Sequence, residues 1–331
     1  MALPNFICVG AERAGTTPLW RVLRQHPDVF MPEHKETHFF TRLYDKNPLV
    51  LYEAQYFGAC RGQRAIGEAT PEYMRFPEVP GLLRKALGPD LKLIFCLRDP
   101  IRRAFSQYLL RCRLLEENES FARALALESR RIEANRYRGT RAAYVGGSLY
   151  ARQIGHFLEV FPKENMFFMV LEEDFAEARA GTVARLCDFL GVRSDVPLNL
   201  EVRDTSNVAP RVVIVPRGET RTLPMKNRSA GITLHGEAVL FVTGNKATQR
   251  ILYSPSAQAL GFFRKVAANI TRELPEGVAA ILYRDFFREE IRRVETLLGR
   301  DLACWRMPWE KLAAEHAATG AAESATPATD R

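Results

Sequence analysis

The first residues that could do chemistry lie at positions 6 to 20, FICVGAERAGTTPLW, where a glycine-rich turn separates an apolar run from an amphipathic stretch. Such a turn directs backbone N–H groups and a helix N-terminus at one point, which is the geometry of an anion site. Gly15 lets the backbone approach a ligand closely, and Arg13 offers a charged fork for oxyanions. The residues predicted to bind a phosphate group are Arg13, Ala14, Gly15, Thr16 and Thr17.

The spacing of the two glycines matches a nucleotide triphosphatase loop, but the lysine of that loop is missing. The loop requires Gly-Lys-Ser/Thr, whereas here Thr16 and Thr17 follow Gly15. A P-loop kinase or nucleotide triphosphatase is therefore an alternative that the motif disfavours. A corner of this kind can also lack a ligand altogether.

A second candidate site lies in LRDPIRRAFSQY, where a buried strand ends at Arg98. Open α/β sheets bind their ligands at the carboxyl ends of the strands, which is where this strand delivers the guanidinium group. Ser106 lies about two helical turns further on, so it could share an oxyanion with Arg98. The alternative is a surface pair between Arg98 and Asp99, with Ser106 an ordinary helix residue.

The stretch PEHKETHFF supplies Lys35, Glu36 and His38 beside two aromatic residues, Phe39 and Phe40. A carboxylate or an imidazole held against apolar rings can have its pKa moved toward neutrality, as a general base requires. The alternative is a solvated charged loop in which His38 packs or hydrogen-bonds locally.

The stretch GEATPEY places Glu68 and Tyr73 at the end of a further strand, where they could form a pocket wall. We expect these two residues, together with Lys35 and His38, to contact the substrate. The alternative is ordinary packing at a strand end, followed by a proline turn.

Strands and helices must alternate to bring these stretches together, and the sequence predicts that they do so to about residue 190. The alternation favours an α/β fold with a doubly wound parallel sheet. Thr16 is the expected N-cap of the first helix. The expected strands are residues 5–9, 64–73, 91–97 and 165–175, and the expected helices are residues 16–25, 79–90, 101–118, 146–160 and 181–190.

The rest of the chain has a different character. Residues 212–260 look β-like with polar turns, and a final helix over residues 282–300 then closes the fold. We expect a single domain over residues 1–310, with residues 212–260 as an atypical insert. The Ala/Thr/Glu-rich residues 311–331 are predicted to be a disordered tail.

Composition limits the class of protein. The 331 residues are 47% hydrophobic and 26% charged, as in folded rather than disordered chains. The net charge of +8 suits an anionic ligand or acceptor, although a soluble basic surface would give the same value. Six scattered cysteines without CxxC pairs predict no metal site and a reducing compartment. With no leader-like or membrane-spanning run, the expected location is cytoplasmic.

Four stretches together resemble, in order and spacing, the sulfotransferase family that uses 3′-phosphoadenosine 5′-phosphosulfate (PAPS). The resemblance spans about residues 5–207, with a weaker echo in the closing helix, and is strongest to the branch that sulfates glycans, as heparan sulfate sulfotransferases do. It implies a bacterial-type soluble member with a P-loop-like three-layer fold, a central parallel sheet flanked by helices. The stretches are GAERAGTTPLWRVLRQHPDVFMPEHKETHFF, GEATPEYM, LKLIFCLRDPIRRAFSQY and GGSLYARQIGHFLEVFPKENMFFMVLEEDF.

The resemblance implies a role for each matched residue. The loop from Arg13 to Thr17 would hold the 5′-phosphosulfate, and Arg98 and Ser106 would hold the 3′-phosphate. Glu36 would be the catalytic base.

Two positions depart from the family pattern. Arg13 stands where the family more often has lysine, which keeps the positive charge but removes a group able to donate a proton at neutral pH. We expect Arg13 to stabilise charge on the leaving group. The family's Lys-Gly-Arg loop for the 3′-phosphate is not evident, and Arg211 in NVAPR is the substitute candidate.

The implied reaction is in-line transfer of the sulfuryl group from PAPS to a hydroxyl or amine, releasing adenosine 3′,5′-bisphosphate without a metal. The expected partners are this nucleotide donor and a glycan, glycolipid or small-metabolite acceptor, with no nucleic acid and no transmembrane segment. A non-catalytic nucleotide-binding homologue remains an alternative, although Glu36, Arg98 and Ser106 all match their family types.

Overall fold

The computed structural model describes residues 2–134, 140–202, 211–223, 232–242, 249–271 and 273–324. The chain divides into two compact units. The first comprises Met1–Arg103, Val145–Asp204 and Glu276–Arg331, and the second comprises Ala104–Tyr144 and Thr205–Pro275. The expectation of one domain over residues 1–310 stays a prediction, because a compact unit need not fold by itself.

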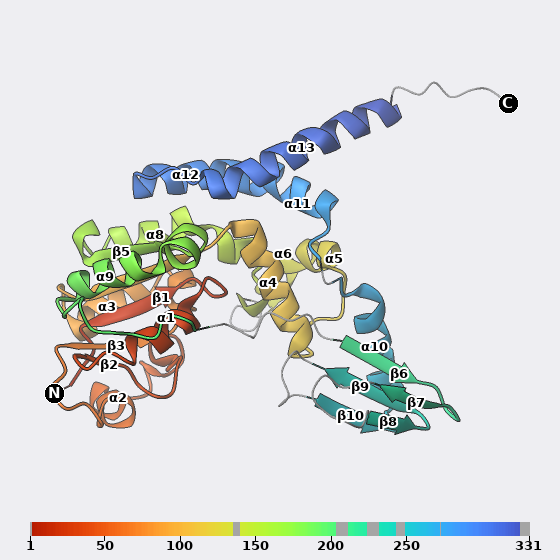
Figure 1. The fold of residues 1–331 in the computed structure, drawn as a ribbon, viewed down its shortest axis with the longest axis horizontal. Coiled ribbons are helices and arrows are strands. Elements are labelled where there is room, and N and C mark those ends of the chain that lie inside the picture. Colours follow the sequence, from red (N-terminus) through yellow and green to blue (C-terminus); the bar gives the residue numbers. More distant parts are fainter. Residues whose placement is uncertain are drawn as a thin grey trace. The chain divides into compact units, whose positions relative to one another are not determined.

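The first unit is built on a five-stranded parallel sheet in the order β2-β3-β1-β4-β5 (Figure 1). The fold class predicted from the sequence, a central parallel sheet flanked by helices, is confirmed. The strands are β1 (Phe6–Gly10), β2 (Val29–Phe30), β3 (Ala65–Ala69), β4 (Lys92–Leu97) and β5 (Met166–Val170).

Helices connect and cover these strands, as short β-to-α connections require. The predicted helices were found with boundaries shifted by a few residues. The helices of this unit are α1 (Thr16–Leu23), α2 (Leu49–Tyr56), α3 (Val79–Leu87), α8 (Tyr150–Leu158), α9 (Arg179–Leu190), α11 (Glu276–Leu282), α12 (Arg288–Leu298) and α13 (Ala303–Ser324), and α4 (Pro100–Arg113) begins in it and continues into the second unit.

The second unit holds the β-like segment of the sequence. β9 (Ala238–Val242) pairs antiparallel with both β6 (Arg211–Val215) and β10 (Gln249–Tyr253), and β7 (Thr220–Leu223) pairs antiparallel with β8 (Ile232–His235). Besides most of α4, the described residues of the unit form the helices α5 (Phe121–Ala126), α6 (Glu128–Ala134) and α10 (Ala257–Asn269).

Several details differ from the sequence-based predictions. The expected strands 64–73 and 165–175 end earlier, at Ala69 and Val170, and Leu171–Glu177 is a π-helical turn. The N-cap of α1 is Gly15 in a left-handed conformation, not Thr16, which is the first helical residue and is buried. The chain is helical through Ser324, where we expected disorder from residue 311. Alanine has the highest helix propensity, which accounts for this extension. No described helix is both long and apolar enough to cross a membrane.

The order of the strands selects one place for a ligand. Within the sheet, β2 and β3 lie on one side of β1, and β4 and β5 lie on the opposite side of β1. Such a switch point leaves a crevice at the carboxyl ends of the neighbouring strands, here β1 and β4. The glycine-rich loop follows β1 and Arg98 follows β4, so both predicted anion-binding segments reach this edge.

Close packing of β1 against β3 depends on Gly67, which pairs in register with Phe6. A Cβ at Gly67 would lie well under 3.0 Å from the Phe6 ring, which is fully buried. We expect Gly67→Ala to lower the free energy of unfolding by about 1–3 kcal/mol, as overpacking of a core does.

Urea unfolding of the variant would measure this loss. Gly81→Ala is the matched control, because a Cβ at Gly81 in α3 would meet no atom within 4 Å. Adding Phe6→Leu to Gly67→Ala should recover part of the loss. Equal stability of Gly67→Ala and the wild type would contradict the assigned register.

Candidate functional site

Residues 11–15, the phosphate loop, connect β1 to α1 and are held from below by the sheet. The Ala11 N–H donates to the carbonyl oxygen of Cys96 in β4 at 2.6 Å. At Gly15, φ is 89° and an added Cβ would lie 2.7 Å from Leu171 Cδ1, so glycine is required there. Gly15 has no side chain, so this N-cap residue makes no side-chain hydrogen bond to the backbone N–H groups at the start of α1. The loop therefore keeps the geometry of an anion site.

The predicted phosphate-binding residues contribute in two ways. Ala14 and Thr16 are buried, so they can offer a ligand their backbone N–H groups rather than their side chains. Arg13 and Thr17 are half-buried, at positions from which a side chain can reach solvent.

The structure brings Arg98 to this loop. Its Nη1 donates to the carbonyl oxygen of Arg13 at 3.2 Å, so the guanidinium group lies directly beside the phosphate loop. The alternative of a simple pair between Arg98 and Asp99 does not describe this arrangement, since the Asp99 carboxylate contacts Trp309 and the start of α4.

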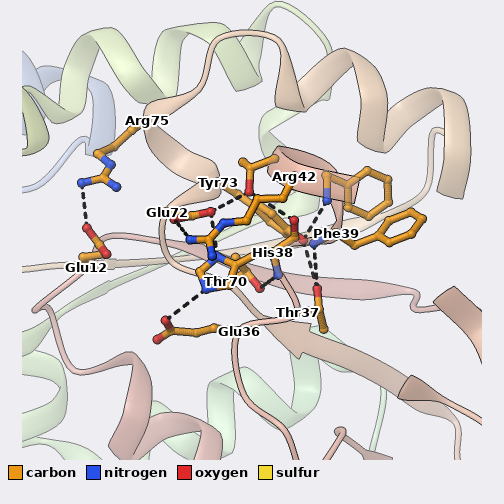
Figure 2. Close-up of polar contacts among 12 residues, drawn as sticks. Glu12, Glu36, Thr37, His38, Phe39, Arg42, Thr70, Glu72, Tyr73 and Arg75 are labelled. Atoms are coloured by element: carbon orange, nitrogen blue, oxygen red, sulfur yellow. Dashed lines mark hydrogen bonds and ion pairs between the residues drawn. The ribbon is translucent and has the colours of Figure 1, made fainter. Parts of the chain in front are cut away.

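An acidic residue, Glu12, lies inside the phosphate loop, and sequence reasoning missed both it and its partner. Arg75 Nη1 lies 2.7 Å from Glu12 Oε2, and both side chains are largely buried (Figure 2). Arg75 ends the 3₁₀ turn Tyr73–Arg75 that follows β3. The pair compensates a carboxylate that would otherwise repel an anionic ligand.

Residues 33–38, the acceptor loop, carry Lys35, Glu36 and His38. The Glu36 N–H donates to the carbonyl oxygen of Ala69 at the end of β3, at 3.1 Å. Lys35 Nζ contacts Glu36 Oε1 at 2.5 Å, and the Glu36 side chain is 36% exposed. Glu36 is therefore anchored through its backbone while its second carboxylate oxygen faces His38, whose Nε2 is 3.9 Å away.

His38 is oriented by Glu72, which precedes the 3₁₀ turn Tyr73–Arg75. His38 Nδ1 lies 2.7 Å from Glu72 Oε1 (Figure 2). Burial alone would raise the pKa of Glu72, but the hydrogen-bonding contacts of His38 and Thr41 and the charges of His38 and Arg42 lower it to about 2. An ionised carboxylate can only accept, so this contact favours a proton on Nδ1, while Nε2 points toward Glu36.

The buried carboxylate beneath the acceptor loop is Glu68, not Glu36. Burial raises the pKa of Glu68, and the hydrogen bonds that it accepts oppose this rise. Phe39 and Phe40 pack with tyrosines in the same cluster, so the apolar surroundings expected for Glu36 belong to Glu68. The donors to Glu68 are Tyr52 (2.7 Å) and Tyr73 (3.1 Å) to Oε1, and Thr37 (2.8 Å) and Thr70 (2.7 Å) to Oε2.

The buried environment of Glu68 and Tyr73 does not fit the expectation that their side chains contact the substrate. Both side chains are at most 1% exposed, and the Glu68 oxygens are occupied by these four donors. They support the acceptor loop from below, through Thr37, rather than presenting atoms at its surface.

Three site residues share an uncommon backbone conformation. Arg13 and Glu36 both have φ of 69°, and His38 has φ of 53°. Non-glycine residues rarely adopt this left-handed region, and such strain clusters at functional sites. Three of the five described non-glycine residues with positive φ, namely Arg13, Glu36 and His38, are therefore candidate site residues; the other two are Leu115 and Ser254.

Two predicted phosphate ligands lie in the second unit. Ser106 is a buried residue of α4, and Arg211 begins β6, with its side chain outside the described part of the structure. Their roles stay predictions. Among the described residues, no group of three or more His, Cys, Asp or Glu side chains could hold a metal ion.

The contact between Glu72 and His38 predicts a pH dependence of stability. Because the folded pKa of Glu72 is about 2, below its ordinary 4.5, this stabilisation is present above pH 4.5 and is lost as the pH falls toward 2. The shift corresponds to at most about 3 kcal/mol.

We expect the free energy of unfolding to fall more steeply between pH 5 and pH 3 in the wild type than in Glu72→Gln, as measured by urea unfolding. Glu159→Gln, at an exposed position, should keep the wild-type slope. Identical slopes in Glu72→Gln and the wild type would refute the ion pair.

Comparison with known proteins gives this geometry a family. The family profile described as "Sulfotransferase domain" matches residues 3–211. Human heparan sulfate glucosamine 3-O-sulfotransferase 6 is 34% identical over 194 residues, which are 57% of this chain and 53% of that protein. Human heparan sulfate glucosamine 3-O-sulfotransferase 3B1 is 34% identical over 191 residues, 58% of this chain and 47% of that protein.

The match to these relatives is partial, whereas a solved structure matches most of the chain. The chain spans about half the length of the curated relatives it matches. A sulfotransferase from Alicyclobacillus acidocaldarius has a similar crystal structure, with a TM-score of 0.63 and 28% identity, and the match covers 92% of this chain and all of that one. The profile covers more than half of the chain and includes the phosphate loop, the acceptor loop and Arg98. The chain therefore belongs to the sulfotransferase family.

Proposed function

We propose that this protein transfers the sulfuryl group from PAPS to an acceptor hydroxyl or amine, on a glycan or glycolipid. The observation that carries the proposal is the contact between Arg98 Nη1 and the Arg13 carbonyl oxygen. It puts a fixed cation beside an anion-binding loop that lacks the lysine of triphosphatases. The likeness to heparan sulfate 3-O-sulfotransferases supports a saccharide acceptor.

The donor would lie across the carboxyl ends of β1 and β4. The backbone N–H groups of residues 13–17 would bind its 5′-phosphosulfate, together with the Arg13 guanidinium group. Arg98 would bind the 3′-phosphate, in a bidentate geometry that a guanidinium group favours. Ser106 and Arg211 are proposed as further 3′-phosphate ligands from the sequence alone.

Glu36 is the proposed general base. The acceptor oxygen forms its bond to sulfur while Glu36 takes the acceptor proton, and the bond from sulfur to the bridging phosphate oxygen breaks. The electron pair of that bond leaves with adenosine 3′,5′-bisphosphate. Arg13 and the loop N–H groups stabilise the charge on the leaving group, where one such donor is typically worth ~3 kcal/mol.

Lys35 and His38 would assist Glu36 in different ways. The Lys35 ammonium group holds one Glu36 oxygen, leaving the other for the acceptor. With Nδ1 beside the Glu72 carboxylate, the Nε2 atom of His38 would be an acceptor when the ring is neutral. It can therefore bind a second acceptor hydroxyl beside the one that reacts. This gives His38 the substrate-contacting role predicted for it, whereas Lys35 would act through Glu36.

We expect Glu36→Gln to lower the transfer rate by about 100-fold or more, because an amide cannot accept the acceptor proton. Binding of the nucleotide should stay within about twofold of the wild type, since Glu36 lies on the acceptor loop. Transfer of radiolabelled sulfate from PAPS to a panel of saccharides would measure the rate, and calorimetry would measure binding.

The matched control is Glu33→Gln, which removes an exposed charge from the same loop. It should retain the wild-type rate. Near wild-type turnover in Glu36→Gln would refute the base assignment and direct attention to His38.

The donor class is tested by calorimetric titration with adenosine 3′,5′-bisphosphate, AMP, and ATP with magnesium. We expect the bisphosphate to bind at micromolar concentration, more tightly than the other two. Arg98→Ala should weaken binding of the bisphosphate at least about tenfold and leave binding of AMP nearly unchanged, because AMP lacks the 3′-phosphate.

Arg61→Ala, at an exposed site, should change neither affinity. If Arg98→Ala weakened binding of the bisphosphate and of AMP equally, Arg98 would not be the ligand of the 3′-phosphate. A wild-type preference for ATP with magnesium would identify a variant triphosphate loop and overturn the proposed function.

A further inference from the structure

The peptide unit that joins Arg98 to Asp99 is held at both of its polar atoms. The hydroxyl of Tyr150 donates to the carbonyl oxygen of Arg98 at 2.9 Å. The N–H of Asp99 donates to Glu172 Oε1 at 3.1 Å. Because these two atoms belong to one peptide plane, the pair of bonds sets the direction in which the chain leaves β4.

One side chain of the C-terminal helix contacts both of these groups. Trp305 in α13 donates its indole N–H to Glu172 Oε2 at 2.9 Å. Its ring also packs on Tyr150, with the ring centroids 5.9 Å apart. Trp305 and Tyr150 are fully buried, so neither can move to replace a lost bond with water.

A second tryptophan of the same helix holds the next residue. The indole N–H of Trp309 donates to Asp99 Oδ2 at 2.7 Å. Asp99 Oδ1 accepts from the N–H groups of Ile101 and Arg102, which starts α4 directly after the strand. Burial raises the pKa of Asp99 to about 6, and the bonds from Arg102 and Trp309 oppose the rise.

We propose that Trp305 is a positioning residue for recognition of the 3′-phosphate, acting through the Arg98–Asp99 peptide plane. The indole orients Glu172 and its ring supports Tyr150, and these two side chains fix the peptide from which the Arg98 side chain extends. The bond from Arg98 Nη1 to the phosphate loop is then made from a defined backbone position. This inference rests on the proposed function, since it assigns Arg98 to the donor.

The test is Trp305→Phe, which keeps an aromatic ring and removes the indole N–H. We expect binding of adenosine 3′,5′-bisphosphate to weaken about tenfold, with binding of AMP within about twofold, because a small displacement of Arg98 affects the group that it contacts. The ratio of the two affinities, measured by calorimetry, should therefore fall about tenfold. A role in stability alone would not change this ratio.

Two further variants separate positioning from folding. Tyr283→Phe removes a hydrogen bond of 3.0 Å to Glu310 in α13 that involves neither Glu172 nor Tyr150, and it should leave the ratio unchanged. Glu172→Gln keeps Trp305 in place but replaces a carboxylate that accepts two bonds with an amide that offers one oxygen. It should lower the ratio in the same way, and it carries the test if Trp305→Phe does not fold.

The dependence on Arg98 supplies the decisive comparison. In an Arg98→Ala background, Trp305→Phe should have no further effect on the affinity ratio. An unchanged ratio in Trp305→Phe and Glu172→Gln, or equal losses for both nucleotides, would overturn the inference. If the wild type itself does not prefer the bisphosphate to AMP, the proposed function fails instead, which is a separate result.

Discussion

Compensation of negative charge beside the predicted anion site is the constraint on which the site depends. The edge of the sheet that would receive an anionic donor also carries the carboxylates of Glu12, Glu36 and Glu72, and each has a cationic or hydrogen-bonding partner. Glu12 pairs with Arg75, Glu36 with Lys35, and Glu72 with His38 and Arg42. Without these partners the carboxylates would repel the ligand and would be costly to bury.

The short turn after β3 supplies partners for charged residues in two loops. Arg75 reaches the phosphate loop, while Glu72, three residues earlier, reaches His38 in the acceptor loop (Figure 2). Beneath it, Glu68 gathers four hydroxyl groups into a buried network that packs against the aromatic cluster. The phosphate loop and the acceptor loop are therefore both contacted by this one segment, so that a change in the turn would affect both.

The C-terminal helix α13 also contacts the site, at the residues that follow β4 and β5. The family profile ends at residue 211, but Trp305 and Trp309 bond to Glu172 and Asp99 at the ends of β5 and β4. The similar bacterial sulfotransferase structure covers 92% of the chain, so the likeness of fold extends past the profile. Rigid support of this kind lets a site stabilise charge without reorganising.

The sequence by itself determined the elements and the candidate residues whose signals are local. Apolar runs and glycine turns predicted β1, β4 and the phosphate loop, and the end of β4 predicted the place of Arg98. Only the tertiary structure decided the partners. Glu12 and Arg75 are far apart in the chain and meet because β1 lies beside β3, and Asp99 meets Trp309 because α13 packs at the end of β4. The tertiary structure also decided that Glu68, not Glu36, is the buried carboxylate, since burial depends on what packs above a residue and not on its neighbours in sequence.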